Sequence, residues 1–311
     1  MDLRIRGVAV HGDRIIACSR PQIFSISLDG VVTVLAGGTE VGFADGNGPD
    51  ARFTEPQGVA IREDGSVVVA DTRNHSIRLV TPEGDVTTLA GNGEDGFADG
   101  NGPNARFYSP YGVAVRRDGT IVVADTMNHS IRLVTPEGDV TTLAGNGDEG
   151  FADGNGPNAR FSFPLGVAVR RDGTIVVADT MNDGIRLVYP NGDVTTLAGN
   201  GEGGFADGNG PGARLSGPHG IAVRQDGAIV VSDTGNNRIR LVTPEGDVTT
   251  LAGNGERGLA DGSGLDARFD IPFGVAVFED GKIVVSSLGR NSIRLITDYN
   301  YEGDVMTKAA R

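Results

Sequence analysis

Short runs of apolar residues separated by polar turns dominate the hydrophobic pattern of the chain. In one stretch, apolar runs of three to five residues occupy 113–115, 121–124, 131–134 and 140–144. They are rich in Val and Ile, which is typical of buried β-strands. An Asp-Gly pair between the first two runs favours a tight hairpin. We expect four antiparallel strands that form one small twisted sheet.

The same pattern recurs along the whole chain. A Gly-Val-Ala-Val motif or a close variant begins at Gly7, Gly58, Gly112, Gly166, Gly220 and Gly274, with a first spacing of 51 residues and then spacings of 54. Such a period is typical of propellers, solenoids and arrays, in which each sheet buries its faces against its neighbours. A β-solenoid is the alternative, but its coils are shorter and lack four hairpin-linked strands. We therefore predict an all-β, six-bladed β-propeller of four-stranded antiparallel blades in a single domain, residues 1–311. The blades are expected at approximately 1–37, 52–91, 106–145, 160–199, 214–253 and 268–308.

The connections assign the two faces of the predicted propeller. After its fourth strand, each full repeat carries a Gly-rich junction, such as 145–164, which must return to the inner strand of the next blade. The junction therefore lies on the same face as the turn at 125–129, and we name this the loop face. The Asp-Gly hairpins lie on the opposite face, named the hairpin face.

The repeats resemble those of a known family. The run Val-Ala-Asp-Thr-x-Asn-His-Ser-Ile-Arg-Leu-Val contains Asn74-His75-Ser76 in one copy and Asn128-His129-Ser130 in the next. It is similar to the signature of NHL-repeat β-propellers, whereas Asp183 and Asn237 stand at the histidine position in later copies. The resemblance implies a propeller fold. The family contains protein- and RNA-binding modules, and related six-bladed propellers include hydrolases and lyases, so fold alone does not supply a function.

The charge of the chain argues against nucleic-acid and membrane partners. The formal net charge is −14 and only Lys282 and Lys308 supply lysine, whereas binding to nucleic acid or anionic lipid needs a basic surface. The chain has no apolar signal core and no apolar run of about 18 residues. Cys18 stands alone, so no disulfide forms within the chain. We expect a soluble, cytoplasmic monomer, and the start of the first motif at Gly7 leaves open that it is a module of a larger protein.

Charged and aromatic residues that recur in the repeats are interpreted as scaffold, because a catalytic residue is needed only once. The aspartates that end the second strand are Asp71, Asp125, Asp179 and Asp233, and the third strand carries Arg78, Arg132, Arg186, Arg240 and Arg294. A second arginine series comprises Arg52, Arg106, Arg160, Arg214 and Arg268. We expect charge-assisted contacts between strands, loops and neighbouring blades. Eight phenylalanines recur at two repeat positions and are expected in the core: Phe43, Phe97, Phe151 and Phe205, and Phe53, Phe107, Phe161 and Phe269.

Neither a cofactor nor a metal site is expected. Gly-x-Gly-x-x-Gly occurs in four junctions, but a phosphate-binding loop leads into a helix, and Phe-Ala-Asp-Gly-Asn-Gly-Pro follows the first copy. His75, His129 and His219 map to the loop face. The blades of His75 and His219 lie across the ring, so these three side chains are not expected to converge within about 2.1 Å of one ion. No catalytic set stands out.

The positions where near-identical repeats differ are the candidate site. The residue before each motif glycine is different in every copy, and we expect these residues at the mouth of the central channel: Arg6, Gln57, Tyr111, Leu165, His219 and Phe273. Nearby loop-face positions add Tyr108, Phe163, Met127 and Met181. Tyr, Phe, Met and Arg are enriched at protein interfaces, and Glu94-Asp95 and Asp148-Glu149 would form an acidic rim that favours basic partners.

We therefore expect a non-enzymatic scaffold module that binds a protein or peptide on the loop face, with the channel mouth as anchor. Two alternatives remain open at this stage. One is a hydrolase or lyase with a metal in the central channel. The other is a structural repeat propeller without a dedicated ligand, in which the variable positions reflect drift at tolerant loop sites.

Overall fold

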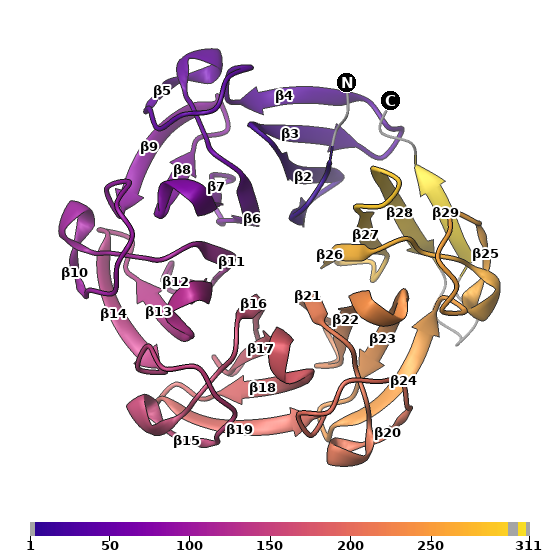
Figure 1. Cartoon of the computed structure of the whole chain (residues 1–311). Helices are drawn as coiled ribbons and strands as arrows, with labels where there is room; N and C mark the ends of the chain where they lie inside the picture. Colours follow the sequence, from indigo (N-terminus) through magenta and orange to yellow (C-terminus); the bar gives the residue numbers. More distant parts are fainter. Residues whose placement is uncertain (1–3, 298–303, 309–311) are drawn as a thin grey trace.

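The computed structural model describes residues 4–297 and 304–308 and contains six β-sheets arranged as blades around a central axis (Figure 1). The predicted all-β class and the six-bladed propeller are confirmed. The four main strands of each blade follow one another along the chain from the inner to the outer strand, and blades 1 to 6 follow one another in sequence order. The ring closes where β26 (Pro272–Val277) of blade 6 packs against β1 (Val8–His11) of blade 1.

Four main strands run antiparallel from the channel outwards in every blade. Blade 1 consists of β1, β2 (Arg14–Ser19), β3 (Gln22–Ser27) and β4 (Val32–Ala36). Blade 2 consists of β6 (Pro56–Ile61), β7 (Val67–Asp71), β8 (Ser76–Val80) and β9 (Asp85–Ala90). Blade 3 consists of β11 (Pro110–Val115), β12 (Ile121–Asp125), β13 (Ser130–Val134) and β14 (Asp139–Ala144). Blade 4 consists of β16 (Pro164–Val169), β17 (Ile175–Asp179), β18 (Gly184–Val188) and β19 (Asp193–Ala198). Blade 5 consists of β21 (Pro218–Val223), β22 (Ile229–Asp233), β23 (Arg238–Val242) and β24 (Asp247–Ala252). Blade 6 consists of β26, β27 (Ile283–Ser287), β28 (Ser292–Thr297) and β29 (Asp304–Lys308).

The expectation of four strands per blade is incomplete, because blades 2 to 6 gain a fifth, two-residue strand from the preceding junction. These strands are β5 (Gly46–Asn47), β10 (Gly100–Asn101), β15 (Gly154–Asn155), β20 (Gly208–Asn209) and β25 (Gly262–Ser263). In blade 3, Gly100 pairs with Val140 of the outer strand and Asn101 pairs with Asp139. Because the junction runs along the outer edge of its blade, it covers backbone groups that would otherwise remain unpaired there. In the described part of blade 1, no such strand lies beside β4.

The helical segments are 3-10 turns of three residues. Those in the junctions are η1 (Gly48–Asp50), η3 (Gly102–Asn104), η5 (Gly156–Asn158), η7 (Gly210–Gly212) and η9 (Gly264–Asp266). Those after the second strands are η2 (Thr72–Asn74), η4 (Thr126–Asn128), η6 (Thr180–Asn182) and η8 (Thr234–Asn236). In the described ranges, no helix has the length and apolar character that crossing a bilayer requires.

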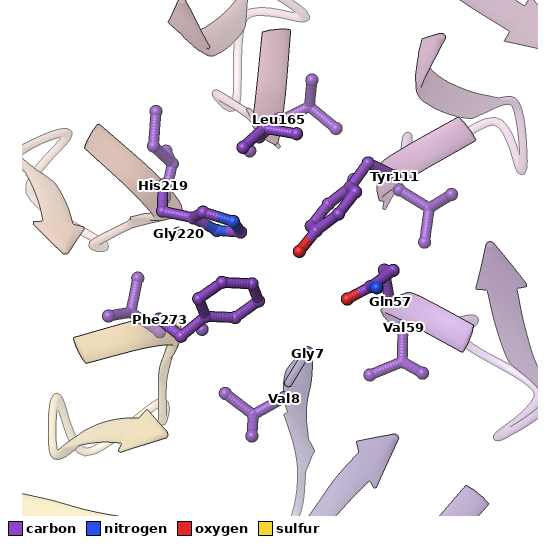
Figure 2. A pocket seen from close by; sticks show the side chains of 17 residues that line it. Gly7, Val8, Gln57, Val59, Tyr111, Leu165, His219, Gly220 and Phe273 are labelled. Atoms are coloured by element: carbon purple, nitrogen blue, oxygen red, sulfur yellow. The ribbon is translucent and has the colours of Figure 1, made fainter. Parts of the chain in front are cut away.

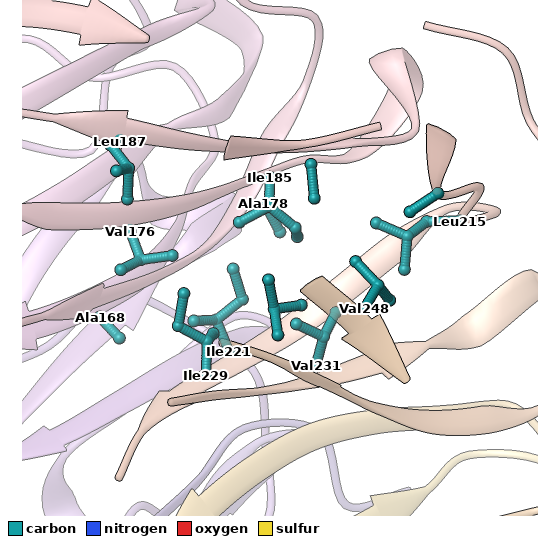
Figure 3. Packing of buried hydrophobic residues seen from close by; sticks show 13 residues of the cluster. Ala168, Val176, Ala178, Ile185, Leu187, Leu215, Ile221, Ile229, Val231 and Val248 are labelled. Carbon is teal, nitrogen blue, oxygen red and sulfur yellow. The ribbon is translucent and has the colours of Figure 1, made fainter. Parts of the chain in front are cut away.

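Apolar clusters between neighbouring blades form the core. Between blades 4 and 5, Val176 and Leu187 of one sheet face Ile229 and Val231 of the other, together with Leu215 from the junction (Figure 3). Clusters of the same kind lie at the other interfaces, including the one between blades 6 and 1. The second strands of blades 2 to 6 are buried along their whole length, which explains their continuous β-branched runs.

The six motif glycines form a ring around the channel, where each meets the backbone of the following blade. A Cβ atom added at Gly112 would collide with the carbonyl oxygen of Leu165, and one added at Gly166 with that of His219. Gly274 makes the corresponding approach to the carbonyl oxygen of Arg6, so the contact also closes the ring. The motif glycine is therefore required by backbone-to-backbone packing between blades.

Candidate functional site

A buried arginine holds the loop face of each of blades 2 to 6, whereas Phe24 stands at the equivalent position of blade 1. In blade 3, Arg132 Nη1 lies 2.6 Å from Asp125 Oδ2, and Arg132 Nη2 lies 2.8 Å from Asp99 Oδ1. Asp125 Oδ1 accepts the backbone N–H of Tyr108 at 2.8 Å, which ties the end of the junction to the second strand. The predicted charge-assisted contacts are confirmed, and the buried pair recurs as Asp71–Arg78, Asp179–Arg186 and Asp233–Arg240. The second arginine series forms more exposed ion pairs, such as Arg106–Glu94 at 3.3 Å.

The buried aspartates are ionised at neutral pH. Burial raises the pKa of Asp125 to about 6, while Arg132, Asn128 and the N–H of Tyr108 oppose the shift. The carboxylate therefore carries its charge at pH 7 and neutralises the guanidinium of Arg132, which has no exposed surface. Because each charge is partnered inside the protein, these residues are structural.

Four of the eight recurring phenylalanines lie at the surface, so the expectation that all eight are core residues is wrong. They are Phe43, Phe97, Phe151 and Phe205. Phe97 is 41% exposed and its ring covers the guanidinium of Arg132, with a centroid distance of 4.9 Å. The buried Phe107 contacts the same guanidinium at 5.3 Å. A ring face attracts a cation, so the exposed ring shields the buried charge from water.

The signature histidines hold the loop of the next blade. His75 Nδ1 accepts the N–H of Ser109 at 3.1 Å, and His129 Nδ1 accepts the N–H of Phe163 at 3.2 Å. Asp183 and Asn237 supply a side-chain oxygen for the same purpose in blades 4 and 5. His, Asp and Asn can each supply a side-chain atom that accepts a hydrogen bond, which explains why the three residue types alternate at one repeat position. Burial lowers the pKa of His75 and of His129, so both nitrogens remain acceptors at neutral pH.

Phe163 owes its position to an uncommon backbone conformation. Its φ is 49°, in the left-handed region, and Ser109 has a φ of 50° at the equivalent place in blade 3. A bulky residue rarely adopts such a φ. The bond from its N–H to His129 helps to hold this conformation, and the two rings meet edge to face with centroids 4.9 Å apart.

Five of the predicted site residues meet in the channel. Gln57, Tyr111, Leu165, His219 and Phe273 line one cavity, together with the ring glycines and the residues that follow them. Tyr111, His219 and Phe273 point toward one another (Figure 2). The centroid of His219 lies 3.6 Å from that of Phe273 and 5.1 Å from that of Tyr111. His219 and Phe273 are only 9% and 8% exposed, and the cavity measures about 80 Å³. The aromatic side chains thus close the channel mouth.

Arg6 reaches the same cluster from blade 1. Burial raises the pKa of Tyr111, and the charge of Arg6 with its hydrogen bond to Tyr111 opposes this shift. The Arg6 carbonyl oxygen accepts the hydroxyl of Ser286 at 2.6 Å across the ring closure. The side chain therefore acts inside the channel, while its backbone joins blades 6 and 1.

His219 makes the stability of the ring sensitive to acid. Burial, together with the charge of Arg6, lowers the pKa of His219 to about 3. A group whose pKa is lowered from about 6.5 contributes stability that is complete above pH 6.5 and is lost as the pH falls toward 3. We expect the free energy of unfolding of the native protein to fall relative to that of His219→Gln by roughly 1.4 kcal/mol per pH unit below pH 6.5. Urea denaturation of both proteins at about pH 7 and about pH 5 checks this. The difference between them isolates His219 from the buried aspartates, and a constant difference would contradict the prediction.

The other four predicted site residues lie outside the channel, on blades 3 and 4. They are Tyr108, Met127, Phe163 and Met181, named the apolar arc below. The N–H of Met127 donates to the carbonyl oxygen of Tyr108 at 3.1 Å, and His129 links the two blades through its contact with Phe163. Tyr108 is 36% exposed and Met181 is 64% exposed. The structure thus divides the predicted site into a closed channel cluster and an open apolar arc.

Comparison with known proteins shows which sequence family has this repeat. A sequence model of the NHL repeat matches residues 53–78 and 215–240. Each matched segment runs from the junction residue that packs in the core to the buried arginine of blade 2 or blade 5. The chain belongs to the NHL-repeat family. The chain is 32% identical over 276 residues to Protein SUPPRESSOR OF QUENCHING 1, chloroplastic, of Arabidopsis thaliana. The matched region covers 83% of this chain and 26% of that protein. It is 29% identical over 314 residues to NHL repeat-containing protein 2 of Bos taurus, covering 88% of this chain and 43% of that one. This NHL propeller thus spans less than half the length of these relatives.

Solved structures share the fold at low sequence identity. A streptogramin B lyase has a TM-score of 0.63 and 14% identity, over 99% of this chain and 83% of the lyase. A gluconolactonase from Xanthomonas campestris has a TM-score of 0.58 and 17% identity, over 82% of this chain and 76% of the enzyme. An auxiliary nutrient binding protein from Bacteroides ovatus has a TM-score of 0.66 and 18% identity, over 95% of this chain and 66% of the binding protein. Enzymes and a binding protein therefore share the fold of this NHL propeller, and the site must decide its function.

Proposed function

We propose that this NHL propeller is a non-enzymatic binding module that captures a basic segment of a protein or peptide on its loop face. The apolar arc is the observation that carries the proposal. It places Met181, Tyr108 and the partly exposed Met127 and Phe163 on neighbouring blades. Large apolar side chains on a rigid scaffold are typical anchors of interfaces.

Acidic side chains beside the apolar arc favour a basic partner. The charge of Asp95 acts on His75, and that of Glu149 acts on His129. Glu149 also accepts the hydroxyl of Ser162 at 2.6 Å, which fixes its carboxylate next to Phe163. Glu94 lies 3.3 Å from Arg106 and Asp148 lies 3.7 Å from Arg160, yet both acidic side chains remain 74% exposed. Lys and Arg of a partner could pair with this rim while its apolar side chains cover the arc.

The channel cluster supports the arc from within. The cavity of about 80 Å³ at the mouth is well below the roughly 300–1,000 Å³ of typical small-molecule sites. The clustered rings of Tyr111, His219 and Phe273, which meet in tilted and edge-to-face contacts, fill the space that a substrate would need. We assign these residues the role of a rigid floor beneath the partner, and the exposed residues of the arc make the first contact.

The alternative of a hydrolase or lyase gains its support from fold alone. The histidines of the loop face have other partners: His75 and His129 accept backbone N–H groups, and His219 lies between two rings. Over residues 4–297 and 304–308, no three His, Cys, Asp or Glu side chains are grouped as metal ligands. Elemental analysis of protein purified without chelators distinguishes the binding module from the metal-dependent hydrolase or lyase, because a stoichiometric metal would favour the hydrolase or lyase.

Removal of the two most exposed arc residues tests the proposal. We expect Tyr108→Ser with Met181→Ser to weaken binding of Lys/Arg-rich peptides on an array by about 30-fold, because truncation of an interface anchor removes about 2 kcal/mol. The control is Leu265→Ser, which alters a residue with 60% exposure in η9. Equal binding by the double variant and the control would contradict the site, and equal binding of charge-reversed peptides would contradict the basic partner. Unchanged thermal melting of the variants excludes unfolding as the cause.

A further inference from the structure

The hairpin face carries a third repeat series of arginines, directly after the inner strands. The series comprises Arg62, Arg116, Arg170 and Arg224 in blades 2 to 5, with His11 in blade 1 and Phe278 in blade 6. A further arginine follows in blades 3 and 4 only. We name Arg116, Arg117, Arg170, Arg171 and Arg224 the arginine sector. It belongs to neither the buried ion pairs nor the apolar arc.

The arginine sector is an excess of positive charge on an acidic protein. Its hairpins contain five arginines and three aspartates, in a chain of net charge −14. Asp226 pairs with Arg224 at 3.2 Å. Asp118 and Asp172 instead accept the backbone N–H groups of their own turns at 2.9 Å. Among the described residues, no acid lies within 4.0 Å of the charged nitrogens of the four arginines in blades 3 and 4. The charges of Asp118 and Asp172 act on Arg116 and Arg170 at longer range, so four guanidinium groups face two carboxylates and an anion would meet net positive charge there.

A hollow between the hairpins of blades 3 and 4 provides the space for a ligand. It measures about 390 Å³ and is lined by the Arg-Arg-Asp turns of the two blades, with Pro190 at its side: Arg116, Arg117 and Asp118 from one blade and Arg170, Arg171 and Asp172 from the next. A second hollow of about 300 Å³ continues toward Arg224 and is also lined by Arg170 and Arg171. Both volumes lie within the range of small-molecule sites, roughly 300–1,000 Å³, in contrast to the channel mouth.

Two guanidinium groups in this hollow have unused donors. The Nε and Nη2 atoms of Arg116 and of Arg170 are shielded from water and have no hydrogen-bond partner among the described residues. Arg132 Nε also lacks a partner among the described residues, but both of its Nη atoms are bonded, so the unused Nη2 distinguishes Arg116 and Arg170. Nε and Nη2 form the side edge of a guanidinium, which offers two parallel N–H groups to one oxyanion. Leaving such donors unsatisfied is unfavourable, so an anion that accepts from them would stabilise this part of the ring.

We propose that the hollow between blades 3 and 4 binds the phosphate group of a small phosphomonoester, with Arg116 and Arg170 as its main ligands. A rotamer change would turn the two side edges toward the phosphate, while Arg117 and Arg171 lie at the rim. Two guanidinium groups balance a dianion. A phosphate group carries its charge and its three terminal oxygens on one phosphorus atom and can accept from both side edges, whereas a dicarboxylate divides the same charge between two separate groups. The site lies on the face opposite the apolar arc and is independent of the function proposed above.

Calorimetric titration at low ionic strength tests the site, with inorganic phosphate and phenyl phosphate as probes and malonate as the carboxylate probe. We expect saturable 1:1 binding of both phosphates, tighter than that of malonate, and a loss of about 10-fold or more in Arg116→Gln with Arg170→Gln. Arg73→Gln on the loop face is the matched control and should bind phosphate like the native protein. No saturation up to about 10 mM phosphate, tighter binding of malonate, or an equal loss in the control would overturn the proposal. The Arg116→Gln, Arg170→Gln variant should still bind basic peptides on the array. Failure of the phosphate site is therefore distinguishable from failure of the apolar arc as a peptide-binding site.

Discussion

Replacement of Asp125 by alanine is expected to lower the free energy of unfolding by about 3–5 kcal/mol. The change removes the carboxylate that lies 2.6 Å from Arg132 Nη1 and accepts the N–H of Tyr108. Arg132 then remains fully buried with Asp99, half exposed, as its only carboxylate partner among the described residues. The end of the preceding junction also loses its attachment to the second strand.

Urea denaturation followed by far-ultraviolet circular dichroism measures this loss, since the chain contains no tryptophan. The control is Glu137→Ala in the exposed turn of the same blade, which should change stability by no more than about 0.5 kcal/mol. If the two variants unfold at the same urea concentration, the buried ion pair does not stabilise the blade and our account of the loop face fails.

A methyl group at a ring glycine is expected to have the second largest effect. In Gly112→Ala, the new Cβ would lie closer than 3.0 Å to the carbonyl oxygen of Leu165, a separation that real Cβ atoms essentially never show. The obstacle is backbone rather than a flexible side chain, so blades 3 and 4 must move apart and loosen the apolar cluster between them. We expect a loss of roughly 3 kcal/mol or more, with faster hydrogen exchange in β11 and β16.

Gly212→Ala is the matched control, because a Cβ atom at Gly212 meets no atom within 4 Å. This substitution should be neutral or stabilise the protein by up to about 1 kcal/mol, since alanine restricts the unfolded chain. Equal stability of the two alanine variants would show that the blades can separate freely at the ring, contrary to the packing described above.

Most of the fold was predictable from the sequence because the repeat constrains it six times over. The period and the β-branched runs predicted the propeller, and the junction length predicted the loop face. The fifth strand was missed because Gly100-Asn101 has no strand-like composition, and it pairs only because the junction lies along the blade edge. The surface position of Phe97 was missed because a recurring aromatic suggests a core, whereas a buried guanidinium also needs an apolar cover.

The candidate site was predictable in its residues and less so in its arrangement. Variation between copies identified the channel positions, and five of them do line one cavity. Their packing into one closed cluster depends on the radius of the channel, which the residues alone do not supply. The role of His129 could have been predicted, because the residue types found at that repeat position, His, Asp and Asn, all have a side-chain hydrogen-bond acceptor. The Arg116-Arg117 and Arg170-Arg171 pairs are visible in the sequence, but the scaffold interpretation considered only the two arginine series that include Arg52 and Arg78.

The glycine ring also has a consequence for how such a protein can evolve or be engineered. Each closing contact joins a glycine to the main-chain carbonyl of the next blade, as between Gly112 and Leu165. The identity of the side chain on that carbonyl residue does not enter the contact. The six channel positions can therefore be exchanged between copies, or diversified in a library, while the ring stays closed. Substitutions at the channel mouth can therefore change which partner is bound while the contacts between the blades stay the same.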